Sequence, residues 1–161
     1  MSIAQRSAQT IWTGPLDPHL PVQPSDADDP AYGRGTLALP GSPLDGLTVS
    51  WAARVGDPGD QTNPEQLLAA AHSSCFSMAL SLKLTEAHRP PEQVQAEATV
   101  TLGAVDGRPT VVSSLLFVRA RVPGMDDDAF QKTVREAAEL CPVSRLFAGA
   151  RISVEALLEP Q

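Results

Sequence analysis

The chain has 161 residues, a length that suits one compact domain over residues 1–161 with a core of its own. Apolar residues make up 42% of the chain and aromatic residues only 4%, so we expect a core of Leu, Val and Ala. The 12 basic and 19 acidic residues give a net charge of -7. That charge disfavours nucleic acid and anionic membrane surfaces as partners, because their phosphates are repelled.

The first residues, Met1 to Arg6, are polar and lack the apolar run of a signal peptide. The chain also has no run of 18 consecutive apolar residues that could span a bilayer. These features predict a cytoplasmic protein with no membrane partner. In that compartment a structural disulfide is rare, so the two cysteines are expected to be reactive, metal-binding or simply buried.

The first 62 residues are predicted to be extended and irregular. Strands are expected at residues 7–13, 35–39 and 47–55, with turn residues between them. Residues 15–31 are rich in Pro and Asp, which predicts a surface loop.

A long helix is predicted from Asn63-Pro64-Glu65-Gln66 onward. Asn63 can cap the helix and Pro64 suits its first position. No helix breaker then occurs until after Glu86. Apolar residues extend around most of this helix, so we expect it to be buried on most sides, in the centre of the molecule or of a dimer.

The remaining elements alternate between strand and helix patterns. Residues 94–102 and 111–122 read as a hairpin around Asp106-Gly107. A second helix is predicted from Asp126 to Leu140, followed by a short helical turn over 143–148 and a last strand over 152–158. The predicted fold class is α+β, with antiparallel sheet packed on two helices.

Two cysteines are the first candidates for chemistry. Cys75 lies on the long helix, and Cys141 lies where Pro142 interrupts the second helix. From these residues alone, a reactive thiol and a buried apolar filler both stay open for each cysteine. His72 lies three residues before Cys75, but a histidine on the same helix is poorly placed as a base for a Cys-His hydrolase. We therefore expect a packed or hydrogen-bonded histidine.

Other site classes find little support in the sequence. A zinc site would need four ligands, and the chain has no CxxC or HExxH motif. No phosphate-binding glycine motif occurs either, so neither a metal nor a nucleotide cofactor is expected.

Two motifs carry a resemblance to a known family. The run from Asn63 to Ser81, NPEQLLAAAHSSCFSMALS, closely resembles the central-helix signature of the OsmC/Ohr family. These are the osmotically inducible protein C and organic hydroperoxide resistance proteins. The second signature is Cys141-Pro142-Val143-Ser144. The resemblance covers roughly residues 33–158, and the HSSCFSM form is more similar to the OsmC branch than to the Ohr branch.

The resemblance implies a thiol-dependent peroxidase that reduces organic hydroperoxides and, less efficiently, hydrogen peroxide. Cys75 matches the peroxidatic cysteine, Cys141 the resolving cysteine and Glu65 the active-site glutamate. Arg54 matches the arginine that the family brings from the strand before the central helix. The resemblance further implies an OsmC-like intertwined homodimer. It implies no cofactor, and a dithiol or lipoyl-type protein as external reductant.

The helix itself constrains where Glu65 can act. Glu65 and Cys75 are ten residues apart, about 15 Å along one straight helix. Either Arg54 spans part of that distance, or the carboxylate comes from a second subunit. Two other functions stay open: a non-catalytic member of the same fold that binds a hydrophobic ligand, and a redox sensor whose disulfide changes a partner contact.

Overall fold

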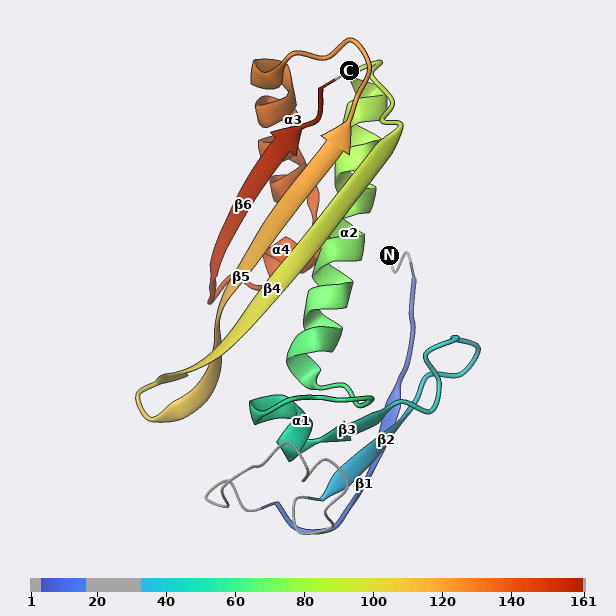
Figure 1. The fold of residues 1–161 in the computed structure, drawn as a ribbon, viewed down its shortest axis with the longest axis vertical. Helices are drawn as coiled ribbons and strands as arrows, with labels where there is room; N and C mark the ends of the chain where they lie inside the picture. Colours follow the sequence, from blue (N-terminus) through green and yellow to red (C-terminus); the bar gives the residue numbers. More distant parts are fainter. Residues whose placement is uncertain (1–3, 17–32, 161) are drawn as a thin grey trace. The chain divides into compact units, whose positions relative to one another are not determined.

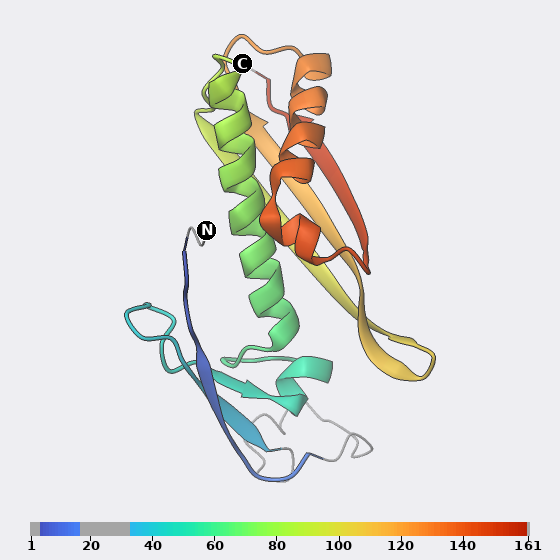
Figure 2. The ribbon, with the colours of Figure 1, turned by 180° about the vertical axis from the view of Figure 1, so that it is seen from behind.

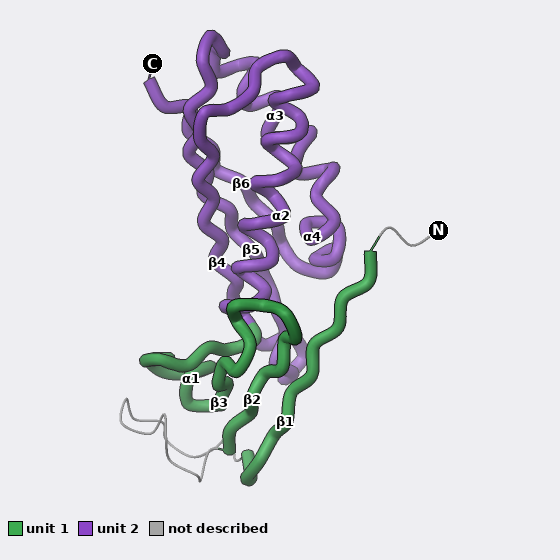
Figure 3. The backbone as a smooth tube through the Cα atoms, turned by 90° about the vertical axis from the view of Figure 1, so that its right-hand side faces the viewer, with its two compact units in different colours: residues 1–64 green, residues 65–161 purple. Residues whose placement is uncertain are grey.

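The computed structural model describes residues 4–16 and 33–160, and most of the predicted loop over 15–31 lies outside these residues. The chain divides into two compact units, residues 1–64 and residues 65–161 (Figure 3). The expectation of a single domain stays a prediction.

The first unit is a small antiparallel sheet with a short helix. Its strands are β1 (Gln9–Thr13), β2 (Arg34–Ala38) and β3 (Thr48–Ser50), in the order β1-β2-β3. Gly35 lies in β2 where a Cβ atom would come within 2.8 Å of Thr10 Cγ2 and 2.9 Å of Val49 Cγ2. The neighbouring strands therefore leave room only for glycine at this position.

The third predicted strand, 47–55, is correct only over Thr48–Ser50. The chain then forms helix α1 (Trp51–Val55), because the Ser50 hydroxyl accepts a hydrogen bond from the Ala53 N–H at 3.1 Å and caps the helix. Arg54 accordingly lies on a helix rather than on the predicted strand. Also within the first unit, the Asn63 side-chain amide donates to the Ala53 carbonyl at 2.9 Å.

The second unit contains the long helix α2 (Pro64–Glu86), which begins and ends where the sequence predicts. Pro64 opens it at the position that needs no N–H donor. Strands β4 (Gln93–Val105) and β5 (Arg108–Arg121) follow as an antiparallel hairpin. Its turn residues Asp106 and Gly107 have φ values of 50° and 74°, which are typical of a tight hairpin turn.

The chain then crosses over from β5 through helices α3 (Asp127–Leu140) and α4 (Pro142–Leu146) to strand β6 (Arg151–Leu158). Helix α3 starts where the sequence predicts, and Asp126 caps it by accepting from the Ala129 N–H at 2.9 Å. Strand β6 pairs with β5 in parallel, so the expectation of an antiparallel sheet is wrong for this pair. A crossover through helices returns the chain in the same direction, whereas a tight turn reverses it.

The core of the second unit lies between the sheet β4-β5-β6 and the helices α2 and α3, which cover one face of that sheet (Figures 1 and 2). The β5 residues Leu116, Val118 and Ala120 point into this core, alternating with exposed neighbours. From the helices, the buried members are Phe76, Ala79, Leu80, Leu84, Phe130, Val134 and Ala137. The mixed α+β class predicted from the sequence is confirmed.

Helix α2 is covered on one side only. His72, Phe76, Leu80 and Leu84 are fully buried, whereas Met78 is 75% exposed and Leu82 is 50% exposed. The prediction of burial on most sides is therefore not met within one chain. Among the described residues, α2 is also the one helix whose length and hydropathy would allow it to cross a membrane. Of its most apolar 18-residue stretch, 28% is buried inside the protein. A core helix of a soluble protein can meet the same criterion.

Candidate thiol site

The second unit brings the two cysteines together. Cys75 lies on α2 and Cys141 lies between α3 and α4, 66 residues further along the chain. Their Sγ atoms are 3.3 Å apart, within sulfur hydrogen-bonding distance, and both thiols are free. Cys75 is half-buried and Cys141 is fully buried. A small reagent therefore reaches Cys75 more easily than Cys141.

The junction between α3 and α4 determines where Cys141 points. Pro142 cannot continue α3, so Cys141 leaves the helix with extended angles (φ -62°, ψ 115°). Its backbone N–H still donates to the Ala137 carbonyl at 2.9 Å. Its sulfur accepts from the Ser144 N–H at 3.5 Å and so caps α4. The sulfur is thereby held between the start of α4 and the thiol of Cys75.

The two thiols differ in acidity. Burial raises the pKa of Cys75, and a hydrogen bond from the Val143 backbone offsets this only in part. Burial also acts to raise the pKa of Cys141. There, however, hydrogen bonds from the Ser144 side chain and backbone, from Cys75 and from Val143 together outweigh it, and the net pKa is lowered. The pKa values of the two thiols are therefore shifted in opposite directions, up for Cys75 and down for Cys141.

His72 is hydrogen-bonded and buried, as the sequence analysis expected. Its Nδ1 lies 2.7 Å from the Ser114 Oγ and its Nε2 lies 2.9 Å from the Ser144 Oγ. The ring also contacts Phe147, with the centroids 5.3 Å apart. Burial lowers the pKa of His72, because removing the ring from water disfavours the imidazolium form.

Sequence reasoning missed Ser114 as part of this site. A signal for it exists in the pattern of β5, where inward positions alternate with outward ones. Ser114 occupies an inward position in the same series as Leu116 and Val118, and it is fully buried. A buried hydroxyl among apolar residues needs a polar partner, which here is His72.

The other two predicted site residues belong to different parts of the chain. Arg54 lies in the first unit, with its guanidinium carbon 5.8 Å from the centre of the Trp51 ring. It helps to line a hollow of about 80 Å³ whose other walls are Trp12, Leu16, Val49, Ser50, Trp51 and Pro64. Glu65 lies in the first turn of α2 in the second unit. Their roles beside Cys75 stay predictions.

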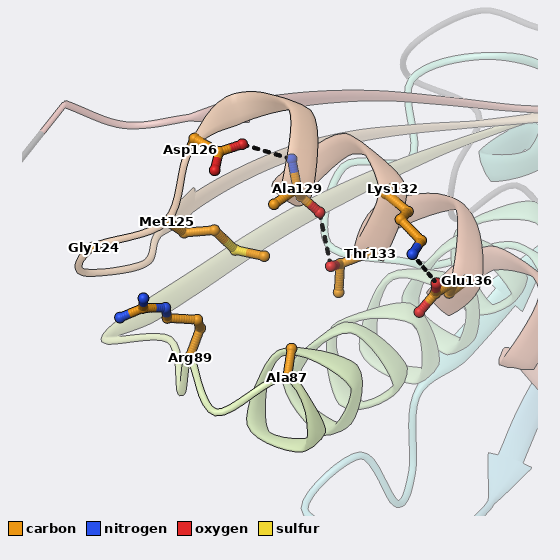
Figure 4. Close-up of a pocket in the computed structure, with 9 residues that line it drawn as sticks. All are labelled: Ala87, Arg89, Gly124, Met125, Asp126, Ala129, Lys132, Thr133 and Glu136. Carbon is orange, nitrogen blue, oxygen red and sulfur yellow. Dashed lines mark hydrogen bonds and ion pairs between the residues drawn. The ribbon is translucent and has the colours of Figure 1, made fainter.

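A second hollow, of about 360 Å³, lies in the second unit between the end of α2 and the start of α3 (Figure 4). Its lining is mixed in charge and contains no thiol: Ala87, Arg89, Gly124, Met125, Asp126, Ala129, Lys132, Thr133 and Glu136. Lys132 and Glu136 pair across one helical turn at 3.9 Å. Over residues 4–16 and 33–160, no group of three or more His, Cys, Asp or Glu residues could hold a metal ion. The thiol pair is therefore the best-defined candidate for chemistry in the described chain.

Comparison with known proteins supplies the family. The model of the OsmC-like protein family matches residues 57–156. The peroxiredoxin OsmC of Escherichia coli (strain K12) is 37% identical over 115 residues, covering 71% of this chain and 79% of that protein. An organic hydroperoxide resistance protein of Xanthomonas axonopodis pv. citri (strain 306) is 36% identical over 95 residues, covering 58% of this chain and 65% of that protein.

The solved structures agree on the fold. An OsmC-like protein of unknown function from Vibrio cholerae O1 biovar eltor str. N16961 superposes with a TM-score of 0.71 at 18% identity, covering 96% of this chain and 100% of that one. The fold and the paired thiols thus define an α+β protein of the OsmC/Ohr fold class. The chain belongs to the OsmC-like family, a peroxide-related family whose members include the two relatives above.

Proposed function

We propose that this chain is a thiol peroxidase that reduces organic hydroperoxides, with Cys75 as the attacking thiol and Cys141 as the resolving thiol. The observation that carries the proposal is the 3.3 Å distance between the two sulfur atoms inside one compact unit. A disulfide requires about 2.05 Å between the sulfurs, so once peroxide has oxidised Cys75, a small movement of one side chain brings Cys141 within bonding distance. The names of the relatives support a peroxide substrate.

The difference in exposure supports the assignment of roles. A hydroperoxide must reach the attacking sulfur, and Cys75 is the more accessible of the two. The resolving thiol needs only to reach Cys75, which the buried Cys141 already does. The lowered pKa of Cys141 suits this second role, because the thiolate is the form that attacks a sulfenic acid.

The proposed reaction has two steps. The Cys75 thiolate attacks the terminal peroxide oxygen, the O–O bond breaks, and the alkoxide takes a proton and leaves as an alcohol. Cys75 is then a sulfenic acid. The Cys141 thiolate attacks the Cys75 sulfur, the S–O bond breaks, and hydroxide leaves and is protonated to water. No cofactor is needed, and an external dithiol or lipoyl-type protein reduces the disulfide by exchange. The reducing cytoplasm is the proposed compartment.

Activation of Cys75 requires a cation. Burial raises the pKa of this thiol within the second unit, so its thiolate is scarce at neutral pH. We assign this role to Arg54, whose guanidinium would favour the thiolate and cannot lose its own charge. Glu65 would hold the guanidinium by a charge-assisted pair. Arg54→Ala should then slow the oxidation of Cys75 more than Arg54→Lys, measured as the second-order rate with cumene hydroperoxide.

The proposed functional state is a homodimer. Glu65 lies about 15 Å along α2 from Cys75, which is too far for direct contact through one helix. A second copy could supply the carboxylate and would also cover the exposed apolar residues Met78 and Leu82. Sedimentation of the wild-type chain tests this state: a monomer with full peroxidase activity contradicts it.

The central test is consumption of cumene hydroperoxide and of hydrogen peroxide with excess dithiothreitol. Cys75→Ser should lose turnover. Cys141→Ser should turn over poorly and should consume two or three equivalents of peroxide as Cys75 accumulates two or three oxygens, seen by intact mass. Ser77→Ala, which removes a hydroxyl two positions from Cys75 on the same helix, is the matched control and should keep turnover. If Cys75→Ser keeps its turnover, the proposal is wrong. If the wild type reacts with one equivalent of peroxide and does not turn over, the protein is a redox sensor instead.

A further inference from the structure

No role has yet been assigned to the buried His72. It lies on the covered face of α2 and is fully buried. A buried imidazole is stable only if its polar nitrogens have partners. Both nitrogens have one here: the Ser114 hydroxyl for Nδ1 and the Ser144 hydroxyl for Nε2. The ring is therefore held in one position and one orientation.

The hydrogen bonds continue from His72 to the thiols. Ser144 is buried, and besides the contact of its hydroxyl with His72 its backbone N–H donates to the Cys141 sulfur at 3.5 Å. Its hydroxyl also acts to lower the pKa of Cys141. Cys141 in turn lies 3.3 Å from Cys75. One continuous path thus connects Ser114, His72, Ser144 and Cys141 to the attacking cysteine. It is formed by α2, β5 and the α3–α4 junction, all within the second unit.

We propose that His72, acting through the hydroxyl of Ser144, accepts the proton of Cys141 and so generates the thiolate that resolves the sulfenic acid on Cys75. The inference rests on the proposed peroxidase function and assigns a residue to its second step. His72 touches neither the peroxide nor Cys75, so it is a positioning residue that acts on the reaction through Ser144.

The protons and electrons balance along this path. In neutral His72 with its proton on Nδ1, the ring donates to Ser114 and Nε2 accepts from the Ser144 O–H. As Cys141 attacks, its S–H proton passes to the Ser144 oxygen, and the hydroxyl proton of Ser144 passes to Nε2. The new S–S bond forms while the S–O bond of Cys75 breaks. Hydroxide leaves with that electron pair, and the proton held by His72 is finally released to make water.

The surroundings of His72 suit a proton acceptor. Burial lowers its pKa, so the ring is neutral and able to accept a proton near pH 7. The titratable groups on its path are the two thiols. The charged side chains of the elements that contact it, Arg108, Arg119 and Arg121 on β5 and Arg145 on α4, are exposed. No carboxylate accounts for its pKa, since burial is the cause.

Ser144 could instead pass the proton directly to water. It lines a hollow of about 320 Å³ together with Ala138, Glu139, Arg145, Ile152 and Val154. If this hollow is the outlet, Ser144 is needed but His72 is not. The two routes are therefore separated by variants of His72 alone.

The test measures the two steps separately in the full-length reduced protein. Cumene hydroperoxide is mixed with the protein, and samples are quenched with dimedone, which traps the sulfenic acid. Intact mass then quantifies the dimedone adduct and the disulfide. His72→Gln keeps a neutral hydrogen-bonding group but cannot hold the proton. It should slow disulfide formation by about 10-fold or more and leave the rate of Cys75 oxidation unchanged.

The pH profile distinguishes a proton acceptor from a structural support. In the wild type the rate of disulfide formation should be nearly constant around pH 7 to 8, and should fall only as the pH approaches the lowered pKa of His72, below the ordinary histidine value near 6.5. In His72→Gln the rate should rise with pH throughout this range, because it then follows ionisation of Cys141 by bulk water. An unchanged rate and an unchanged profile in His72→Gln would overturn the proposal.

Three further variants control for indirect effects. Ser144→Ala should slow disulfide formation as His72→Gln does, and Ser144→Thr, which keeps the hydroxyl, should restore most of the rate. The double variant His72→Gln/Ser144→Ala should be no slower than the slower single variant, since both break the same path. Thr133→Val removes a buried hydroxyl elsewhere in the unit and should react as the wild type. If Thr133→Val is equally slow, the effect is structural and the proposal fails.

A second oxidant, diamide, separates a failure of the peroxidase function from a failure of the proposed proton transfer to His72. Diamide adds to a thiol across its N=N bond, and a second thiolate then displaces the hydrazine and forms the disulfide. This displacement needs ionised Cys141 but no peroxide. Suppose that the wild type does not react with peroxides, yet His72→Gln converts the diamide adduct to the disulfide slowly. Proton transfer through Ser144 to His72 is then supported, and the peroxidase function is contradicted. If His72→Gln converts the diamide adduct to the disulfide at the wild-type rate, proton transfer to His72 is contradicted.

Discussion

The two faces of α2 have similar hydropathy but different surroundings. On one face, His72, Phe76, Leu80 and Leu84 recur every four residues and are all fully buried against the sheet and α3. On another, Met78 and Leu82 are half or more exposed. The comparison shows that an apolar helical pattern identifies the residues that need cover. It does not identify the chain that provides the cover.

The largest effect is expected on the buried face. Phe76→Ala should lower the free energy of unfolding by about 3–5 kcal/mol, because it removes a fully buried ring and leaves a cavity. Urea denaturation followed by circular dichroism measures this loss. A loss below about 1 kcal/mol would contradict the assignment of this face as the core.

The second effect is expected on the exposed face. Met78→Glu should weaken the proposed dimer by about 10-fold or more in Kd, because it would bury a charge against a second copy. Sedimentation equilibrium checks this. Lys132→Glu, which changes an exposed side chain of α3, is the control and should dimerise as the wild type. If Met78→Glu also dimerises as the wild type, the dimer does not use this face.

The third effect concerns the polar member of the buried face. The folded-state pKa of His72 lies below the unfolded value near 6.5, so the unfolded chain binds more protons between these two values. The stability that a neutral His72 contributes is present above about pH 6.5 and is lost as the pH falls through the folded-state pKa, by up to about 1.4 kcal/mol per pH unit.

Urea titrations at several pH values measure this slope for the wild type and for His72→Gln. The variant should lose the contribution of His72 to the slope and keep that of the other groups. Identical slopes in both proteins would mean that His72 has the same pKa folded and unfolded.

The smallest effect is expected where α2 faces solvent near its end. Thr85 is exposed, and its hydroxyl donates to the Ser81 carbonyl within the helix at 2.8 Å. Thr85→Ala should raise stability by a few tenths of a kcal/mol, about the difference in helix propensity. Thermal unfolding detects this change. A clear loss of stability would show that this part of α2 contacts something beyond its own helix.

Local chemistry made much of the fold predictable. Pro64 and Asp126 mark the starts of α2 and of α3, and Asp106-Gly107 form the hairpin turn, because each acts through its own backbone angles or its nearest neighbours. The structure of residues 51–55 was not predictable in the same way. The sequence predicted a strand over 47–55, but the Ser50 hydroxyl caps a helix instead.

The candidate site was predictable only in part. The motifs predicted a pairing of Cys75 and Cys141, and the structure places their sulfurs in contact. The hydrogen bonds of His72 could not be predicted from local sequence, because Ser114 and Ser144 are 42 and 72 residues away. Partners at such separations are determined by the packing of β5 and α4 on α2. The parallel pairing of β6 depends on the same long-range packing.

The crossover from β5 to β6 has a consequence for how the chain folds. Cys141 lies within this crossover, which can dock only after the chain has closed a loop between the paired residues Ser113 and Arg151, 38 positions apart. Closing such a loop is slow compared with forming a helix. A newly made chain therefore completes α2, with its reactive sulfur, before the resolving sulfur reaches it. Oxidants met during synthesis would find Cys75 unprotected, so the folded crossover also shields the protein from irreversible damage.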